Sequence, residues 1–122
     1  MAKKILVVDD EWDVVELITA RLKANGFDVV CAYDGKNALQ EVKNEKPDLI
    51  ILDIMMPELN GSVLCGILKS DEELKSIPIV VLTGQSRELD RKIGRIVKAD
   101  AYITKPFEAE SLLKTINDLL KN

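Results

Sequence analysis

Histidine is absent from this sequence of 122 residues, and it contains only two cysteines. Without histidine the chain cannot form a His-based catalytic triad, and without a CxxC pair it offers no zinc site. Cys31 and Cys65 each lie in an apolar context, and a chain of this length does not need a disulfide to fold. We therefore expect two reduced thiols and a cytoplasmic protein.

Long hydrophobic runs and an excess of positive charge are also missing. No apolar stretch approaches the roughly 20 residues that span a membrane, and the first residues lack a signal-peptide pattern. The net charge is −4 and the pI is near 4.9. This acidic balance argues against direct binding to nucleic acid. Neither the Gly-x-Gly-x-x-Gly motif of dinucleotide domains nor a P-loop is present.

The sequence does have the composition and alternation of one α/β domain. Hydrophobic residues make up 47% and charged residues 31%, which is typical of a globular chain, and we expect a single domain over residues 1–122. Apolar runs expected to form strands alternate with amphipathic segments expected to form helices. The expected strands are Ile5–Val8, Phe27–Ala32, a run from about Asp48 to Asp53, Ile79–Leu82 and Ala101–Ile103. Five such alternations predict a parallel sheet covered by helices on both faces.

The third of these runs, Leu49–Leu52, is the most informative stretch. It is aliphatic throughout, as expected for a strand buried on both faces of a parallel sheet, and it ends at Asp53. Pro57 and Asn60-Gly61 then predict a turn. Ligands of open α/β sheets bind outside the carboxyl ends of the strands, where this carboxylate is expected to lie.

Polar residues follow the other expected strands in the same way. If all strands are parallel, one edge of the sheet collects Asp9, Asp10, Asp53, Thr83 and Lys105. Three carboxylates in one crevice repel one another unless a cation lies among them, and oxygen-only ligands suit Mg²⁺. A hydroxyl and an ammonium beside such an ion are suited to the transfer of a phosphoryl group. Taken singly, each residue has an ordinary structural explanation; their joint placement carries the prediction.

The same positions resemble the receiver domain of two-component response regulators, in particular the single-domain, chemotaxis-regulator kind. The resemblance covers nearly the whole chain and rests on Asp9-Asp10, Asp53-Ile-Met-Met-Pro57 with Gly61, Thr83-Gly84, and Tyr102-Ile-Thr-Lys105-Pro106-Phe107. It implies a flavodoxin-like fold, with a five-stranded parallel sheet of order 2-1-3-4-5 and five helices. The switch point would fall between the first and third strands.

The resemblance also implies a phosphoacceptor and a metal site. Asp53 would be the phosphoacceptor and would attack phosphorus as a nucleophile. Asp9, Asp10, Asp53 and the backbone carbonyl of Met55 would hold Mg²⁺. The protein would thus be a phosphorylation-dependent signalling switch and not an enzyme, apart from its own phosphotransfer and autodephosphorylation.

Three further residues receive roles from the resemblance. Lys105 would neutralise the phosphoryl oxygens, and the Lys105-Pro106 peptide bond is expected to be cis. Thr83 would donate its hydroxyl to the phosphoryl group. Tyr102 would then turn inward and change the surface formed by the fourth helix, fifth strand and fifth helix. A half-buried Tyr102 with its hydroxyl in water is the simpler interpretation, and the sequence does not separate the two.

The implied partners are other proteins. Because the chain has no histidine, the phosphoryl donor would be a histidine kinase or histidine phosphotransfer protein acting in trans, and a downstream target protein would receive the signal. A docking site around Val14, Val15 and Ile18 is one hypothesis, although core packing is the favoured explanation for most of these residues. The protein would be a monomer or a phosphorylation-dependent dimer, and either a stand-alone regulator or one domain of a longer protein.

One departure and one useful residue complete the comparison. The family often has Gly-Ala-Asp before the last strand, whereas this chain has Lys98-Ala99-Asp100, so the preceding helix must end differently. Trp12 is the only tryptophan and lies next to the acidic run, where it would report metal binding optically.

Three alternatives remain in view. A flavodoxin-like electron carrier would need a Ser/Thr/Gly-rich loop after the first strand, where three acids stand instead. An aspartate-dependent phosphatase of the haloacid dehalogenase type would place its nucleophile at Asp9, within an Asp-x-Asp motif that this chain lacks, and generally needs a longer chain. A degenerate receiver acting only as a binding module is disfavoured because no key position is missing.

Overall fold

The computed structural model describes residues 2–53, 61–84 and 99–121. A single five-stranded sheet lies at the centre, and every pairing within it is parallel. The strand order is β2-β1-β3-β4-β5, which confirms the predicted α/β fold and its switch point between β1 and β3. The strands are β1 (Lys4–Val8), β2 (Asp28–Ala32), β3 (Leu49–Asp53), β4 (Ile79–Thr83) and β5 (Ala101–Thr104).

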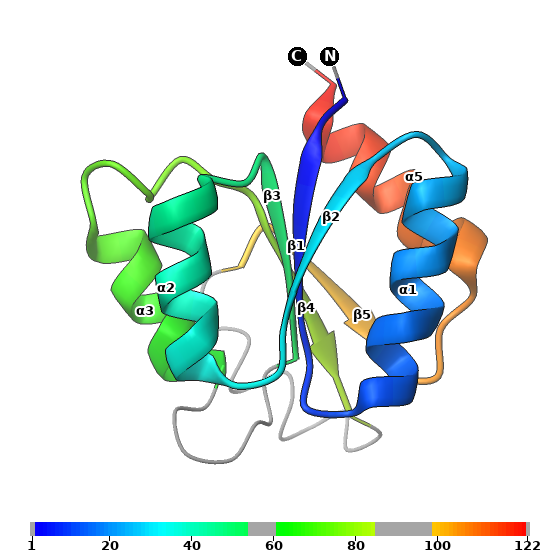
Figure 1. Cartoon of the computed structure of the whole chain (residues 1–122), viewed down its shortest axis with the longest axis horizontal. Helices are drawn as coiled ribbons and strands as arrows, with labels where there is room; N and C mark the ends of the chain where they lie inside the picture. Colours follow the sequence, from blue (N-terminus) through cyan, green and yellow to red (C-terminus); the bar gives the residue numbers. More distant parts are fainter. Residues whose placement is uncertain (1, 54–60, 85–98, 122) are drawn as a thin grey trace.

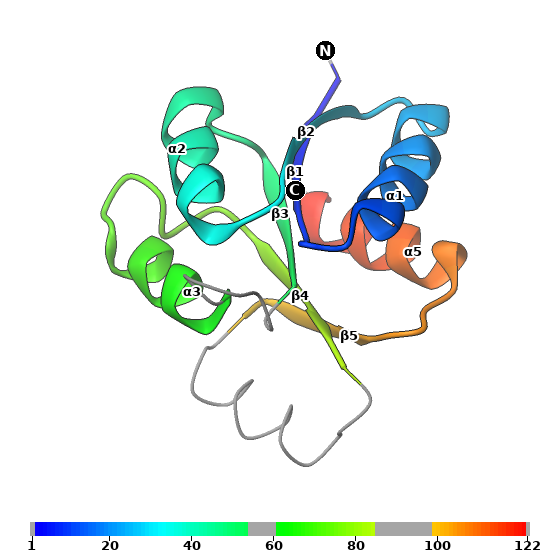
Figure 2. The same cartoon turned by 60° about the horizontal axis from the view of Figure 1, so that its bottom comes forward.

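Helices cover both faces of the sheet. Figures 1 and 2 show helices on either side of the sheet. The helices α1 (Trp12–Ala24) and α5 (Ala109–Leu120) pack on one face, and α2 (Gly35–Glu45) and α3 (Gly61–Ser70) pack on the other. None of them has the length and apolar character of a membrane-crossing helix, within the residues that the structure describes. The helix expected around Leu89, Ile93, Ile96 and Val97, and the turn at Pro57 and Asn60, lie outside those residues.

The aliphatic strands build a separate core on each face. Along β3, Leu49 and Ile51 pack toward α1 and α5, whereas Ile50 and Leu52 pack toward α2 and α3. All five residues of β3 are buried, as expected for a central strand of a parallel sheet. The strand is therefore held from both sides, and the position of Asp53 at its end is fixed by this packing.

The two cysteines belong to opposite cores, so they form no disulfide, as predicted. Cys65 is buried on the α2–α3 side, and Cys31 packs against the core on the α1–α5 side. Burial raises the pKa of the Cys65 thiol above its ordinary value; the nearby Lys69 opposes this rise and the nearby Asp100 adds to it.

Short-range signals set the helix ends. The helix α1 ends at Asn25-Gly26: Gly26 has a φ of 86°, and its amide donates to the carbonyl of Lys23 while the amide of Phe27 donates to the carbonyl of Leu22. The start of α2 is capped by Asp34, whose carboxylate accepts from the amide of Asn37 at 2.7 Å.

Candidate functional site

Two carboxylates meet at the carboxyl edge of the sheet because their strands are neighbours. Asp9 follows the last residue of β1, and Asp53 is the last residue of β3; the pairing of Val8 with Leu52 brings the two strand ends together. The amide of Asp9 donates to the carbonyl of Ala32 at 3.2 Å and so extends the ladder between β1 and β2. Asp9 has no exposed surface, and Asp53 is 6% exposed.

Lys105 lies in the segment after β5, the strand at one end of the strand order, and its side chain extends to these carboxylates. Its amide donates to the carbonyl of Thr83 at 2.8 Å, which continues the ladder between β4 and β5. The Lys105-Pro106 peptide bond is cis, as the resemblance implies. The Nζ of Lys105 donates to Oδ2 of Asp9 at 2.8 Å and to Oδ2 of Asp53 at 3.3 Å. One ammonium thus joins the ends of β1 and β3 to the segment after β5.

A third carboxylate belongs to the same group. Oε1 of Glu11 accepts from Nζ of Lys105 at 3.1 Å, and the amide of Glu11 donates to Oδ1 of Asp9 at 2.9 Å. Glu11 is the third of three consecutive acids, and the sequence pattern predicts no role for it. The run itself was the only signal, because strand placement does not say which of three adjacent side chains turns toward Lys105.

The neighbouring carboxylates keep the ammonium of Lys105 protonated. Burial alone lowers the pKa of its ammonium, but the hydrogen bond to Asp9 and the negative charges of Asp53 and Asp9 outweigh it, with a further contribution from Glu11. The net effect raises the pKa of Lys105 above its ordinary value. The site therefore retains a fixed positive charge beside two buried carboxylates throughout the physiological pH range.

Negative charge still exceeds positive charge at this edge. Asp9, Asp10, Glu11 and Asp53 each offer one carboxylate oxygen, and these four oxygens lie within 4.8 Å of one another. Hard oxygen donors at this separation fit Mg²⁺, which keeps several waters and uses few protein ligands. Asp10 is exposed and open to such an ion. The predicted ligand at Met55 lies outside the described residues.

Thr83 lies at the same edge but turns its hydroxyl toward β5. It ends β4 next to Asp53 and is 5% exposed. Its hydroxyl lies 3.4 Å from the carbonyl of Ile103 and 3.5 Å from the hydroxyl of Thr104, distances at which a hydrogen bond is weak. Among the described residues, these two long contacts are the side-chain hydrogen bonds of the Thr83 hydroxyl, and they hold it only weakly in its present direction.

Tyr102 lies on β5 and is 45% exposed. Its hydroxyl accepts a hydrogen bond from the amide of Ala99 at 2.9 Å, a partner that the sequence did not predict. The adjoining Asp100 accepts from the amide of Ile79 at 2.7 Å and from Nζ of Lys69 at 3.0 Å. Side-chain bonds thus fix the segment before β5, where the sequence departs from the family pattern.

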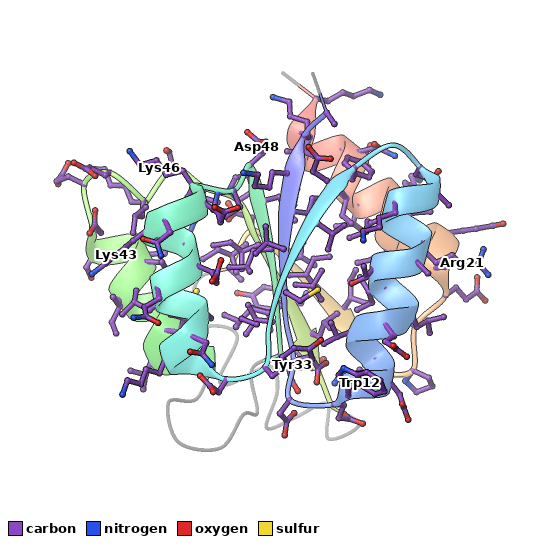
Figure 3. All side chains as sticks on the ribbon, viewed as in Figure 1. Trp12, Arg21, Tyr33, Lys43, Lys46 and Asp48 are labelled. Carbon is purple, nitrogen blue, oxygen red and sulfur yellow. The ribbon has the colours of Figure 1, made fainter. Side chains whose placement is uncertain are left out.

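The suggested docking residues on α1 are mostly part of the core. Val15 and Ile18 are buried and Val14 packs partly against the same cluster, which confirms the favoured explanation and removes Val15 and Ile18 from any docking surface. Trp12 and Leu17 are the large apolar side chains that α1 exposes among the described residues. Figure 3 shows Trp12 at the carboxyl edge of the sheet, remote from Asp48 at the opposite edge.

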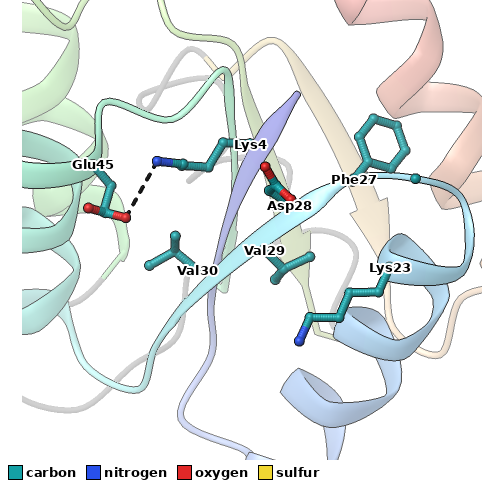
Figure 4. A pocket seen from close by; sticks show the side chains of 8 residues that line it. Lys4, Lys23, Phe27, Asp28, Val29, Val30 and Glu45 are labelled. Carbon is teal, nitrogen blue, oxygen red and sulfur yellow. Dashed lines mark hydrogen bonds and ion pairs between the residues drawn. The ribbon is translucent and has the colours of Figure 1, made fainter. Parts of the chain in front are cut away.

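An open depression of about 550 Å³ lies at the opposite end of the sheet (Figure 4). It surrounds the start of β2, and its charged lining includes Lys4 and Glu45, which form an ion pair at 3.5 Å. None of its lining residues belongs to the acidic cluster. The depression is therefore separate from the edge where the predicted site residues gather.

Known proteins share both the sequence pattern and the fold. The model of the family described as "Response regulator receiver domain" matches residues 5–117. The alkaline phosphatase synthesis transcriptional regulatory protein PhoP of Bacillus subtilis is 41% identical over 121 residues, which are 99% of this chain and 50% of that protein. The chain thus spans about half the length of this curated relative.

Two solved structures are similar over nearly the whole chain. The signal receiver domain of a signal transduction histidine kinase from Syntrophus aciditrophicus has a TM-score of 0.93 and 34% identity, covering 98% of this chain and 90% of that chain. The chemotaxis protein CheY4 of Vibrio cholerae has a TM-score of 0.90 and 31% identity, covering 98% of this chain and 100% of that chain. The chain belongs to the receiver domain family of two-component response regulators.

Proposed function

We propose that this receiver domain, residues 1–122, stores a signal as an aspartyl phosphate on Asp53. The observation that carries the proposal is the contact between Asp53 and Lys105, at 3.3 Å, at the buried carboxyl edge beside Asp9. The carboxylate of Asp53 is nearly buried, and the positive charge of Lys105 stands next to it. Receiver domains are signalling modules, and this arrangement suits one phosphoryl transfer without a separate substrate pocket.

The transfer uses Asp53 as a nucleophile. One carboxylate oxygen forms a bond to phosphorus while the bond from phosphorus to the donor breaks, and the leaving group takes up a proton from solvent. The donor is a phosphohistidine on a histidine kinase or a histidine phosphotransfer protein. It acts in trans, because this chain has no histidine. Hydrolysis of the aspartyl phosphate, which returns the domain to its starting state, is the only other chemistry proposed.

The metal site that we propose consists of Asp9, Asp10, Asp53 and the backbone carbonyl of Met55. Mg²⁺ bound there supplies charge neutralisation for the phosphoryl oxygens. Asp9 is held for this role by the amide of Glu11, which fixes one of its two oxygens. Lys105 supplies a second positive charge, and Thr83 supplies a hydroxyl whose present bonds are weak.

The output is a change of packing around β5. We propose that Thr83 turns toward the phosphoryl group and that Tyr102 moves inward, which alters the surface of β5 and α5. The partner that senses this surface is a protein, and phosphorylation favours either its binding or dimerisation of the domain. We also propose that the protein works in the cytoplasm, where kinases of this system present their phosphohistidine.

The test is the intact mass of the protein after incubation with acetyl phosphate and Mg²⁺. We expect the wild-type protein to gain one phosphoryl group only when Mg²⁺ is present, and the Asp53→Asn variant to gain none. A phosphatase with its nucleophile at Asp9 would keep its covalent intermediate in the Asp53→Asn variant. Absence of uptake by the wild-type protein, with acetyl phosphate and with a phosphohistidine donor, would favour a binding module that is not phosphorylated.

A further inference from the structure

The backbone and the side chain of Glu11 contact different parts of the protein. It is the N-cap residue of α1, and its carbonyl accepts from the amides of Val14 and Val15 at 3.1 Å. Its side chain makes no capping hydrogen bond to the helix. The carboxylate instead contacts Nζ of Lys105 at 3.1 Å. The start of α1 is thereby linked to the residue that follows β5.

The three carboxylates that accept from Lys105 differ in their exposure to solvent, and therefore in the cost of breaking each hydrogen bond. An ammonium has three N–H donors, and three carboxylates accept from this one. The side chains of Asp9 and Asp53 are 0% and 8% exposed, so water cannot readily replace Lys105 there. The side chain of Glu11 is 61% exposed, and water can take the place of Lys105 at little cost.

We propose that Glu11 is a positioning residue that holds Lys105 in the unphosphorylated protein and releases it when a phosphoryl group forms on Asp53. The inference rests on the proposed function. When the phosphoryl group forms, Lys105 turns toward it the N–H group that now bonds to Glu11. This hydrogen bond is the least costly of the three to break. Since the bond exists only before phosphorylation, it stabilises the unphosphorylated form and slows phosphoryl uptake.

The test compares phosphoryl uptake from acetyl phosphate at saturating Mg²⁺, followed by intact mass. Saturation is established for each variant by titration of the Trp12 fluorescence, so that altered Mg²⁺ binding does not enter the rates. We expect Glu11→Gln to take up the phosphoryl group about two- to fivefold faster, the range that corresponds to an exposed ion pair. A structural defect would slow uptake and cannot produce this gain.

Two further variants distinguish loss of the contact between Glu11 and Lys105 from loss of a negative charge. Glu11→Asp keeps the charge, but its shorter side chain favours capping the helix over reaching Lys105, so we expect a gain similar to that of Glu11→Gln. Asp13→Asn removes one exposed charge from the first turn of the same helix and should leave the rate unchanged.

Each outcome decides the inference. Faster uptake in both Glu11 variants but not in Asp13→Asn supports it. An unchanged or slower rate in Glu11→Gln would overturn it, as would an equal gain in Glu11→Gln and Asp13→Asn, which would indicate a general effect of charge. If the wild-type protein takes up no phosphoryl group, the proposed function fails, and this inference fails with it.

Discussion

At the scale of single residues, Lys105 is a cation that compensates the buried negative charge of Asp9 and Asp53. Asp9 is fully buried and Asp53 nearly so, and both accept a hydrogen bond from the same ammonium. A buried carboxylate without a partner destabilises the folded state by several kcal/mol or takes up a proton. The residues that we propose for phosphoryl transfer are therefore also coupled to the stability of the domain.

Replacing Lys105 by methionine tests this coupling. Lys105→Met removes the ammonium that bonds the fully buried carboxylate of Asp9, so we expect the free energy of unfolding to fall by on the order of 3 kcal/mol. Lys75→Met, which removes one partner of an exposed ion pair with Glu72, should change it by less than about 1 kcal/mol. Urea unfolding without Mg²⁺ measures both. Added Mg²⁺ should restore part of the loss in Lys105→Met, and equal losses in the two variants would contradict the account.

The raised pKa of Lys105 predicts a loss of stability at alkaline pH. In the unfolded chain the ammonium loses its proton near its ordinary pKa of about 10.4, whereas the folded protein retains it to a higher pH. The stabilising contribution is thus complete below that value and declines as the pH rises above it toward the native pKa. Urea unfolding between about pH 9 and pH 11 should show a steeper decline for the wild-type protein than for Lys105→Met. Parallel declines would contradict a raised pKa.

At the scale of secondary-structure elements, β5 is fixed to the segment before it by one of its own side chains. The hydroxyl of Tyr102 accepts from the amide of Ala99, and the neighbouring Asp100 bonds Lys69 at the end of α3. An inward movement of Tyr102 has to break the bond to Ala99. This bond therefore favours the packing observed in the unphosphorylated domain.

Tyr102→Phe removes that bond and keeps the aromatic ring. We expect the inward packing to become easier by about 1 kcal/mol, and phosphoryl uptake at saturating Mg²⁺ to rise by a factor of about five. Tyr33→Phe removes a hydroxyl from the other tyrosine, which is 41% exposed after β2, and should leave uptake unchanged. The rate of phosphoryl uptake by each variant is measured from its intact mass. Unaltered uptake by Tyr102→Phe would mean that the hydrogen bond does not oppose the switch.

The same elements show which features the sequence could predict. Aliphatic runs such as Leu49–Leu52 predicted the strands correctly, because only a doubly covered parallel sheet buries every residue of a strand. Parallel strands then place Asp9, Asp53 and Lys105 at one edge, which is why their meeting was predictable. The side-chain partners of Glu11 and Tyr102 depend on rotamers and on the path of neighbouring segments, which periodicity does not specify.

At the scale of the whole molecule, the topology assembles the site from distant parts of the chain. Residues 9, 53 and 105 meet because β1 and β3 are neighbours and the segment after β5 returns to the same edge. The chain spans half the length of its relative PhoP of Bacillus subtilis, a protein named as a transcriptional regulator. We propose that the receiver acts on further protein partners through the face that β5 and α5 form.

The most direct test of the central claim is chemical trapping of the phosphorylated residue. The protein is incubated with acetyl phosphate and Mg²⁺ and then treated with borohydride, which reduces an aspartyl phosphate to homoserine, and peptide masses locate the change. The account predicts homoserine at position 53, dependent on Mg²⁺ and absent from Asp53→Asn. Homoserine at position 9 or 10, or phosphoryl uptake that leaves residue 53 unmodified, would contradict it.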